Sequence, residues 1–280
     1  MRKVEAAKII DAVEEMCMRA AVELPAAVEY MLRQGRQQEQ SPLGQTILSD
    51  ILRNAEIARR KRLPICQDTG TAALWVQFGQ QVQIVGGELE QAINEGVRRG
   101  YERGYLRKSI VRDPLRRENT GDNTPAAIHY EIVPGTTLRL RLLPKGGGCE
   151  NMSRMAFLRP GEGVEAVKSF VLETVEAAGA NPCPPVVVGV GIGGTADQAT
   201  WLAKRALFRD LRDKHPDPFY ADLEQQLLRL INNTGIGPQG LGGTVTALAV
   251  KVETWPCHIT ALPVAVCLNC HAARAAEVSL

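Results

Sequence analysis

Three cysteines of this chain, Cys66, Cys183 and Cys270, lie in tight, polar stretches of sequence. Their surroundings read P-I-C-Q-D-T-G, N-P-C-P-P and L-N-C-H-A. A cysteine that only packs usually lies within an apolar run, whereas proline, glycine and amide neighbours indicate loops that present thiolates. Three such thiolates with no obvious fourth would suit an iron–sulfur cluster in which one iron is left open for chemistry.

The segment C-Q-D-T-G at residues 66–70 is the most specific of these stretches. It places a soft metal ligand, Cys66, two residues before the carboxylate of Asp68. Such an arrangement can hold a metal and position a polar substrate beside it. The alternative is a buried cysteine that precedes an Asx turn.

Basic residues concentrate in the segment 107–123, which contains Arg107, Lys108, Arg112, Arg116 and Arg117. Arginine binds carboxylates in a bidentate manner, so one of these residues could grip an acidic substrate. A run of charges is more often a solvated surface, and this is the expectation for most of the segment. Arg107, which is close to turn residues, is the candidate for substrate binding.

Two glycine-rich segments could bind anions. Residues 145–151, K-G-G-G-C-E-N, offer consecutive backbone N–H groups at the end of an expected strand, although three glycines can also form a flexible loop. Residues 189–194, G-V-G-I-G-G, match the dinucleotide-binding pattern G-x-G-x-x-G. The second strand with its acidic end is missing from the sequence, so this loop is expected instead to shape a pocket close to Cys183.

The C-terminal region crowds Cys257, His258, Cys267, Cys270 and His271 into 15 residues. The spacing C-x-x-C at residues 267–270 could form half of a zinc site, but no second pair completes it. A lone histidine is more often structural. In a chain with four histidines, however, His258 is a candidate for acid–base chemistry or substrate binding.

Alternation and helical periodicity indicate the elements that must position these residues. Helices are expected over residues 3–36 with a break near Pro25, and over 43–61, 88–104, 162–179, 196–213 and 218–232. Strands are expected over residues 71–78, over two stretches of 126–143 that flank the turn at Pro134, and over 186–190 and 244–253. The sequence therefore predicts an α+β fold with a mainly antiparallel sheet, and a single large domain over residues 1–280.

Composition narrows the class of protein. The chain has 280 residues, 45% of them hydrophobic and 23% charged, with a net charge of +2 that is spread along the sequence, so a nucleic-acid-binding face is not expected. The N-terminus carries charges and no apolar run is long enough to span a membrane, which predicts a cytoplasmic protein. Seven cysteines in a reducing compartment are free to act as thiols or metal ligands.

Several motifs occur together, and their order is specific. They read P-I-C-Q-D-T-G, N-T-G-D-N-T-P-A, P-K-G-G-G-C-E-N, C-P-P-V-V-V-G-V-G-I-G-G-T, G-I-G-P-Q-G-L-G-G and N-C-H-A-A-R. With these motifs, nearly the whole chain resembles the iron–sulfur hydro-lyases that comprise class I fumarases and L-tartrate dehydratases. It resembles the α subunit of the two-subunit form, because single-chain relatives continue into a second domain.

The resemblance implies a [4Fe–4S] cluster held by Cys66, Cys183 and Cys270, with Cys149, Cys257 and Cys267 outside the ligand set. It also implies which residues surround the substrate: Gln67, Asp68, Arg107, Gly147 and His258. His258 and Asp68 are the catalytic candidates among them. The base that removes the carbon-bound proton is expected from a β subunit, and the assembly is expected to be a dimer of αβ pairs.

The motifs leave the substrate open. Reversible hydration of fumarate to L-malate is the first hypothesis, and dehydration of L-tartrate to oxaloacetate is the second, because one more hydroxyl on the substrate need change only a few contacts. A nucleotide-binding module that uses residues 189–194 is a hypothesis from another class, and a structural zinc scaffold is a further one. Metal content and nucleotide binding would separate these classes.

Overall fold

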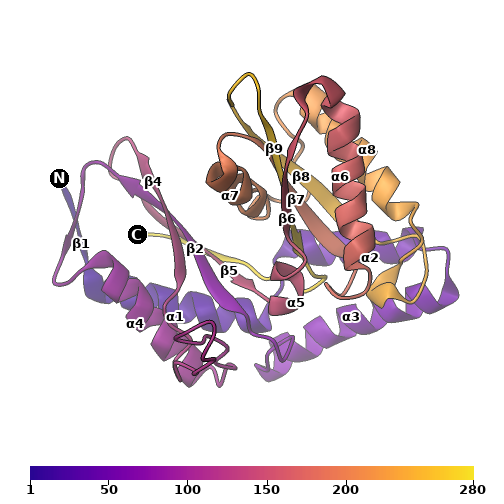
Figure 1. Ribbon diagram of the computed structural model, residues 1–280. Helices are drawn as coiled ribbons and strands as arrows, with labels where there is room; N and C mark the ends of the chain where they lie inside the picture. The colour runs from indigo at the N-terminus through magenta and orange to yellow at the C-terminus, as the bar shows by residue number, and fades with distance from the viewer. The chain divides into compact units, whose positions relative to one another are not determined.

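The computed structural model describes all residues 1–280 and has the predicted α+β composition (Figure 1). Antiparallel strand pairs are in the majority, as predicted. The helices are α1 (Ala6–Val22), α2 (Ala26–Gln38), α3 (Pro42–Lys61), α4 (Leu89–Arg103), α5 (Gly147–Glu150), α6 (Gly163–Ala178), α7 (Ala196–Ala206) and α8 (Pro218–Asn232). The strands are β1 (Arg2–Glu5), β2 (Thr71–Gly79), β3 (Val82–Val85), β4 (Ala127–Val133), β5 (Leu138–Lys145), β6 (Arg154–Leu158), β7 (Val186–Gly193), β8 (Ala247–Trp255), β9 (Leu262–Asn269) and β10 (Ala276–Ser279). None of the helices combines the length and apolar composition that crossing a bilayer requires.

The residues gather into two compact units. Unit 1 comprises Met1–Pro25, Ala55–Gly147 and Arg274–Leu280, and unit 2 comprises Ala26–Asn54 and Gly148–Ala273. Each unit combines stretches that are far apart in the sequence, so no single cut of the chain would release either one. The assignment of residues 1–280 to one catalytic domain stays a prediction.

Unit 1 is built on a four-stranded sheet with the order β10-β5-β2-β4. β2 pairs antiparallel with β5 and parallel with β4. The two strands predicted on either side of Pro134 are therefore formed, but β2 lies between them. Helices α1 and α4 share one apolar core with this sheet, to which Ile9, Met16, Leu74 and Ile93 contribute.

Two glycines of α4 allow it to pack closely against α1. A Cβ atom on Gly96 would lie 2.7 Å from the carbonyl oxygen of Ile10, and one on Gly100 would lie 2.7 Å from the Cβ of Cys17. Real Cβ atoms do not approach other atoms so closely, so any larger residue would force the helices apart. The spacing of four residues puts both glycines on the same helix face, which explains why this helix keeps residues of low helix propensity.

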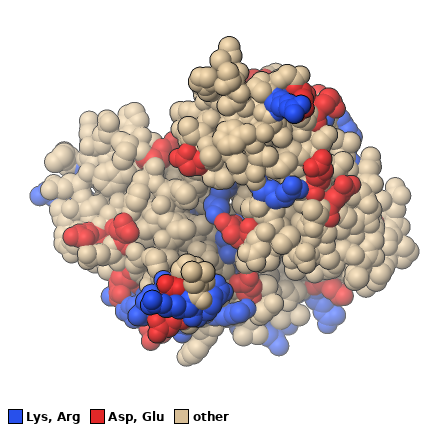
Figure 2. All heavy atoms as spheres, viewed as in Figure 1, with Lys and Arg blue, Asp and Glu red and all other residues tan.

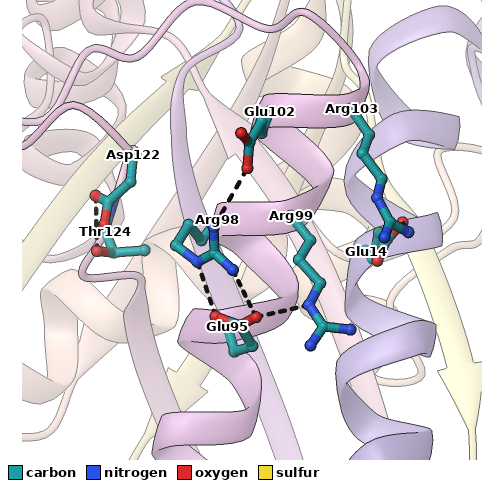
Figure 3. Close-up of polar contacts among 8 residues, drawn as sticks. All are labelled: Glu14, Glu95, Arg98, Arg99, Glu102, Arg103, Asp122 and Thr124. Atoms are coloured by element: carbon teal, nitrogen blue, oxygen red, sulfur yellow. Dashed lines mark hydrogen bonds and ion pairs between the residues drawn. The ribbon is translucent and has the colours of Figure 1, made fainter.

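Charged side chains of the same helices pair with one another (Figure 3). Glu95 accepts hydrogen bonds from Arg98 and Arg99 of its own helix. Between helices, Arg103 of α4 pairs with the nearly buried Glu14 of α1 at 2.6 Å. The pair orients α4 on α1 in addition to the close packing at the glycines.

The pH dependence of stability should reveal the Glu95 cluster. Hydrogen bonds from Arg98 and then Arg99 lower the pKa of Glu95 from 4.5 to about 2. Because the folded-state pKa is depressed, this stabilisation is present above the unfolded-state pKa and is lost as the pH falls toward 2. Glu95→Gln is therefore expected to lower the urea midpoint at about pH 6 and to leave it unchanged near pH 2. An equal loss at both pH values would contradict this assignment.

Unit 2 is built on a four-stranded sheet with the order β6-β9-β7-β8. β7 pairs parallel with β8 and antiparallel with β9. α7 covers one face of the sheet, and α6 and α8 cover the other (Figure 1). Alternate valines of β7, among them Val186, Val188 and Val190, fill the core under α6 and α8.

The glycines of residues 189–194 serve helix packing. A Cβ on Gly189 would lie 2.1 Å from the carbonyl oxygen of Ala203, and one on Gly191 would lie 2.1 Å from that of Ala199. These glycines therefore let α7 approach the sheet, which accounts for the pattern without a nucleotide. The expected loop does not form, because residues 189–193 lie within β7 and only Gly194 follows the strand; a role in a pocket near Cys183 stays a prediction.

The helix predicted over residues 196–213 ends earlier, at Ala206. Arg209 turns its guanidinium toward the carboxylate of Glu224 and the carbonyl of Val252, at 2.7 and 3.0 Å. The Asp210 carboxylate accepts the N–H of Arg212 at 2.9 Å. These side-chain contacts favour an irregular chain over continuation of the helix. Tertiary interactions therefore override the helical pattern of the sequence.

Candidate functional site

The C-Q-D-T-G segment forms a loop of unit 1 before β2, and the carboxylate of Asp68 is fixed within it. Asp68 Oδ1 accepts the N–H of Gly70 at 3.1 Å, and Oδ2 accepts the N–H of Gly147 at 2.8 Å. A Cβ on Gly146 would lie 3.2 Å from Oδ2. The structure thus brings together two predicted site residues, Asp68 and Gly147, and the bare glycine backbone is what admits the carboxylate.

Buried side chains hold the carbonyl groups of this loop. The phenol of Tyr101 donates to the carbonyls of Thr69 and Gly70, at 2.8 and 3.0 Å. Asn123 Nδ2 donates to the Gly70 carbonyl at 3.1 Å. Arg274 Nη2 donates to the Asp68 carbonyl at 2.8 Å. Burial raises the pKa of Tyr101, which keeps its hydroxyl a hydrogen-bond donor.

Gly70 must be a glycine for two reasons. Its φ is +77°, in the region that side chains with a Cβ disfavour, and a Cβ there would lie 2.8 Å from the backbone of Lys145. The loop is therefore packed directly on the strand end that leads to the triple glycine. This contact explains why the two motifs, far apart in the sequence, meet within unit 1.

Arg107 is exposed, and its backbone is anchored to the same loop. The hydroxyl of Thr69 donates to the Arg107 carbonyl at 2.8 Å, and the Ser109 N–H donates to Asn123 Oδ1 at 2.7 Å. Figure 2 shows Lys and Arg gathered over the loop between α4 and β4. Most of these cations are exposed, which fits the predicted solvated surface. Arg107 is also exposed, but its backbone carbonyl is hydrogen-bonded to Thr69.

Cys66 is half-buried, and its Sγ lies 3.3 Å from Oε1 of the exposed Gln67. The thiol is therefore near the surface of unit 1, beside another predicted site residue. It belongs to the loop that carries Asp68, so the loop presents a thiol, an amide and a carboxylate from three consecutive residues.

Cys183 and the residue after Cys270 meet within unit 2. The Nδ1 atom of His271 lies 3.0 Å from the Cys183 carbonyl and 3.0 Å from Gln239 Nε2. Gln239 also donates from its side chain and its backbone to the Pro184 carbonyl, at 2.8 and 2.7 Å. Cys183 has a φ of +53°, an uncommon conformation for a cysteine, and these surrounding contacts hold it there.

Gln239 and His271 were not among the predicted site residues. The sequence signal for Gln239 was the motif G-I-G-P-Q-G-L-G-G, whose glycines permit the tight loop that brings this amide to Pro184. Tyr101, Asn123 and Arg274 of unit 1 were also missed, although two of them lie in quoted motifs. Tyr101 lies within an ordinary amphipathic helix and gave no signal.

The other cysteines differ in their surroundings. Cys17, Cys149 and Cys267 are buried, whereas Cys257 is exposed. Burial and then the nearby Glu14 raise the pKa of Cys17 to about 12, so its thiol stays protonated at neutral pH. Cys149 points its Sγ at the Pro182 carbonyl at 3.4 Å, and Cys267 accepts a hydrogen bond from Ser153 at 3.5 Å.

His258 lies on the connection between β8 and β9, at one end of the unit 2 sheet. The Thr260 N–H donates to its Nδ1 at 3.2 Å, and the Thr260 hydroxyl lies 2.8 Å from the same atom. Register pairs Trp255, at the end of β8, with Gly193 at the end of β7. Cys183 precedes β7 and Cys270 follows β9, so both lie at the opposite end of the sheet.

The length of the sheet separates His258 from these two cysteines. β7 has eight residues, which at about 3.3 Å per residue gives roughly 25 Å. The structure therefore brings Cys183 and Cys270 to one end of the sheet and does not bring His258 to them. No group of three or more His, Cys, Asp or Glu side chains is arranged to hold a metal ion. The predicted ligands divide between the units, Cys66 in unit 1 and the other two in unit 2, so the set stays a prediction.

Comparison with known proteins identifies the family. Residues 10–279 match the family described as fumarate hydratase (Fumerase). The chain therefore belongs to the fumarate hydratase family, as its motifs predicted, and it is an enzyme of the hydro-lyase class.

Two relatives show which members of the family this chain resembles. One relative, from Methanocaldococcus jannaschii, is named as a provisional L(+)-tartrate dehydratase subunit alpha. It is 42% identical to this chain over 277 residues, 96% of each chain. The L(+)-tartrate dehydratase subunit alpha of an Escherichia coli strain is 33% identical over 271 residues, 95% of this chain and 89% of the relative. This chain thus corresponds over nearly its whole length to the subunit named alpha.

Proposed function

We propose that this chain is the α subunit of an L(+)-tartrate dehydratase, which converts L-tartrate to oxaloacetate. The observation that carries the proposal is the full-length similarity to relatives named for that activity, at 42% and 33% identity. Hydration of fumarate to L-malate, the first hypothesis from the sequence, is now the second candidate. It keeps support from the family description, fumarate hydratase.

The proposed cofactor is a [4Fe–4S] cluster held by Cys66, Cys183 and Cys270. These thiols fit it because all three lie at least partly exposed in loops, whereas Cys17, Cys149 and Cys267 are buried. Thiolates of this kind are the ligands that such clusters take. When bound through three thiolates, the cluster supplies an open iron that acts as a Lewis acid on the hydroxyl to be eliminated. A protein with these reduced thiols suits the reducing cytoplasm, where we propose that it works.

The remaining site residues of unit 1 suit a dicarboxylate. The exposed guanidinium of Arg107 can bind one carboxylate in a bidentate manner, and Gln67 can donate to an oxygen from its amide. Asp68 is held by two backbone N–H groups, one of them from Gly147, so its carboxylate is fixed in direction. In the proposed reaction Asp68 enters the step protonated and donates this proton from Oδ2 to the departing hydroxyl, which leaves as water, and the carboxylate then regains a proton from solvent.

A partner chain completes the reaction. The relatives are named alpha subunits, so we propose a β subunit that supplies the base for the carbon-bound proton. Loss of this proton and of the hydroxyl from adjacent carbons of L-tartrate gives the enol of oxaloacetate, which then tautomerises. No oxidant or reductant is required.

His258 requires a second copy of this chain in the proposed site. The roughly 25 Å length of the sheet keeps it from the end that carries Cys183 and Cys270 in its own copy. The end of β8 and the connection that follows it expose Trp255 and Ile259, with exposed fractions of 52% and 89%, which is typical of a surface that contacts another chain. We therefore propose that the assembly is a dimer of αβ pairs in which each His258 serves the substrate bound by the other α subunit.

The test is anaerobic co-expression of this chain with a candidate β subunit, followed by kinetics with L-tartrate, L-malate and fumarate. The αβ enzyme is expected to prefer L-tartrate by at least about tenfold in kcat/KM, because a site built to bind the extra hydroxyl loses that contact with L-malate. The chain alone is expected to bind iron and to lack turnover. A preference for L-malate would favour the second candidate, and full turnover by the chain alone would disprove the need for a β subunit.

A further inference from the structure

The guanidinium of Arg274 is the most deeply buried charge in unit 1, with 1% of the residue exposed. It makes a hydrogen bond from Nη2 to the Asp68 carbonyl at 2.8 Å, while Nε and Nη1 are buried without an acceptor. Burial of a charge is costly unless many hydrogen bonds offset it. Arg274 is thus poorly compensated, and stability alone gives little reason for an arginine at this position.

Asp68 is the residue that benefits from this contact. Its carboxylate is held by the backbone of Gly70 and Gly147, but its own backbone carbonyl is held by Arg274. Tyr101 and Asn123 hold the next two carbonyls, those of Thr69 and Gly70. Arg274 is the residue among these anchors that fixes the peptide directly attached to the proposed catalytic side chain.

We infer that Arg274 is a positioning residue, which sets the direction of the Asp68 carboxylate by fixing the Asp68 carbonyl. The inference deepens the proposed function, on which it rests for the role of Asp68. Arg274 touches no substrate in this arrangement. It acts through the loop, and a small rotation of the Asp68 peptide would carry the carboxylate away from Gly147.

A positioning role and a structural role predict different results for Arg274→Met. Methionine fills the space of the arginine stem and removes the buried charge, while the Asp68 carbonyl loses its donor. These effects oppose each other, so the stability of the whole chain should change little. The loop at residues 66–70, by contrast, should become more mobile. The Asp68 carboxylate should then adopt the orientation toward the Gly147 N–H less often.

Two measurements test this, and the first does not depend on activity. In the chain without cluster or β subunit, Arg274→Met is expected to speed hydrogen exchange of the amides in residues 66–70 by about tenfold, with the rest of unit 1 unchanged. In the αβ enzyme, kcat is expected to fall about a hundredfold with little change in KM, since misplacement of a catalytic group mainly affects the transition state. Arg274→Lys, which keeps a charged donor, should recover part of both losses.

Arg141→Met is the matched control, because Arg141 is a largely buried arginine of unit 1 that pairs with Glu277 and stacks over Trp75. It should leave exchange at residues 66–70 as in the wild type. Wild-type exchange in the loop of Arg274→Met would overturn the inference, as would a uniform loss of protection in both Arg274→Met and Arg274→Lys. If the wild-type αβ enzyme turns over none of the three substrates, the proposed function fails, while the exchange result still decides whether Arg274 fixes the loop.

Discussion

Serine at Cys66, Cys183 or Cys270 is expected to abolish the visible thiolate-to-iron absorbance of the reconstituted chain, one substitution at a time. A serine hydroxyl is nearly isosteric with the thiol but stays protonated near neutral pH, so it is a poor ligand for iron. With three protein ligands proposed for the cluster, each loss leaves only two, and the cluster should not be retained. The measurement is anaerobic reconstitution followed by absorbance and iron analysis.

Cys149→Ser is the matched control for these substitutions. Cys149 is also next to a predicted site segment, but its thiol is buried and points at the Pro182 carbonyl, where a hydroxyl can replace it. This variant should keep the full absorbance, and Cys267→Ser should do the same. Loss of the cluster in Cys149→Ser together with its retention in Cys183→Ser would overturn the ligand assignment.

The sequence offered an Asx turn as the alternative interpretation of the unit 1 loop, and this turn forms because Asp68 and Gly70 are near neighbours in the chain. An aspartate followed by threonine and glycine encodes the turn, and Gly70 adopts the positive φ that this turn requires. The triple glycine was predicted to offer backbone N–H groups to an anion. In the structure the first such anion is the carboxylate of Asp68, which receives the Gly147 N–H.

Contacts between distant segments could not be predicted from the sequence. Arg274 and Asp68 are 206 residues apart, and no periodicity links an arginine near the C-terminus to a carbonyl near residue 68. β9 was missed because its run of valines, alanine and leucine is short and lies in a segment that drew attention for its cysteines. Once β9 is placed between β6 and β7, Cys267 becomes a buried strand residue and Cys270 a loop residue.

Sheet register also determines how far His258 lies from the cysteines Cys183 and Cys270, which the sequence left open. Without the parallel pairing of β7 and β8, nothing in the sequence separates this histidine from Cys270, which follows it by only 12 positions. The 12 positions include the whole of β9, which runs from one end of the sheet to the other, so His258 and Cys270 lie at opposite ends. Proximity in sequence was therefore misleading here.

Mixing two inactive variants should restore activity if His258 serves the other copy. His258→Ala and Asp68→Ala are each expected to lower kcat by about 10²–10⁴, as loss of an acid–base group does. In a mixed dimer one site combines the intact Asp68 of one α subunit with the intact His258 of the other. The other site lacks both groups, so mixed dimers purified through both tags should have about half of the wild-type activity per α subunit. The experiment is co-expression of the two tagged variants with the β subunit, purification through both tags, and measurement of kcat.

Asp68→Ala mixed with Arg107→Ala is the control, because both residues come from unit 1 of the same copy. Each site in that mixture lacks one of the two groups, so activity should stay at the level of the single variants. Recovery in the His258 mixture alone would support an active site shared between two copies. If the His258 mixture also stays inactive although mixed dimers are isolated, His258 does not act across the dimer, and its role must be sought at the end of the sheet where the structure places it.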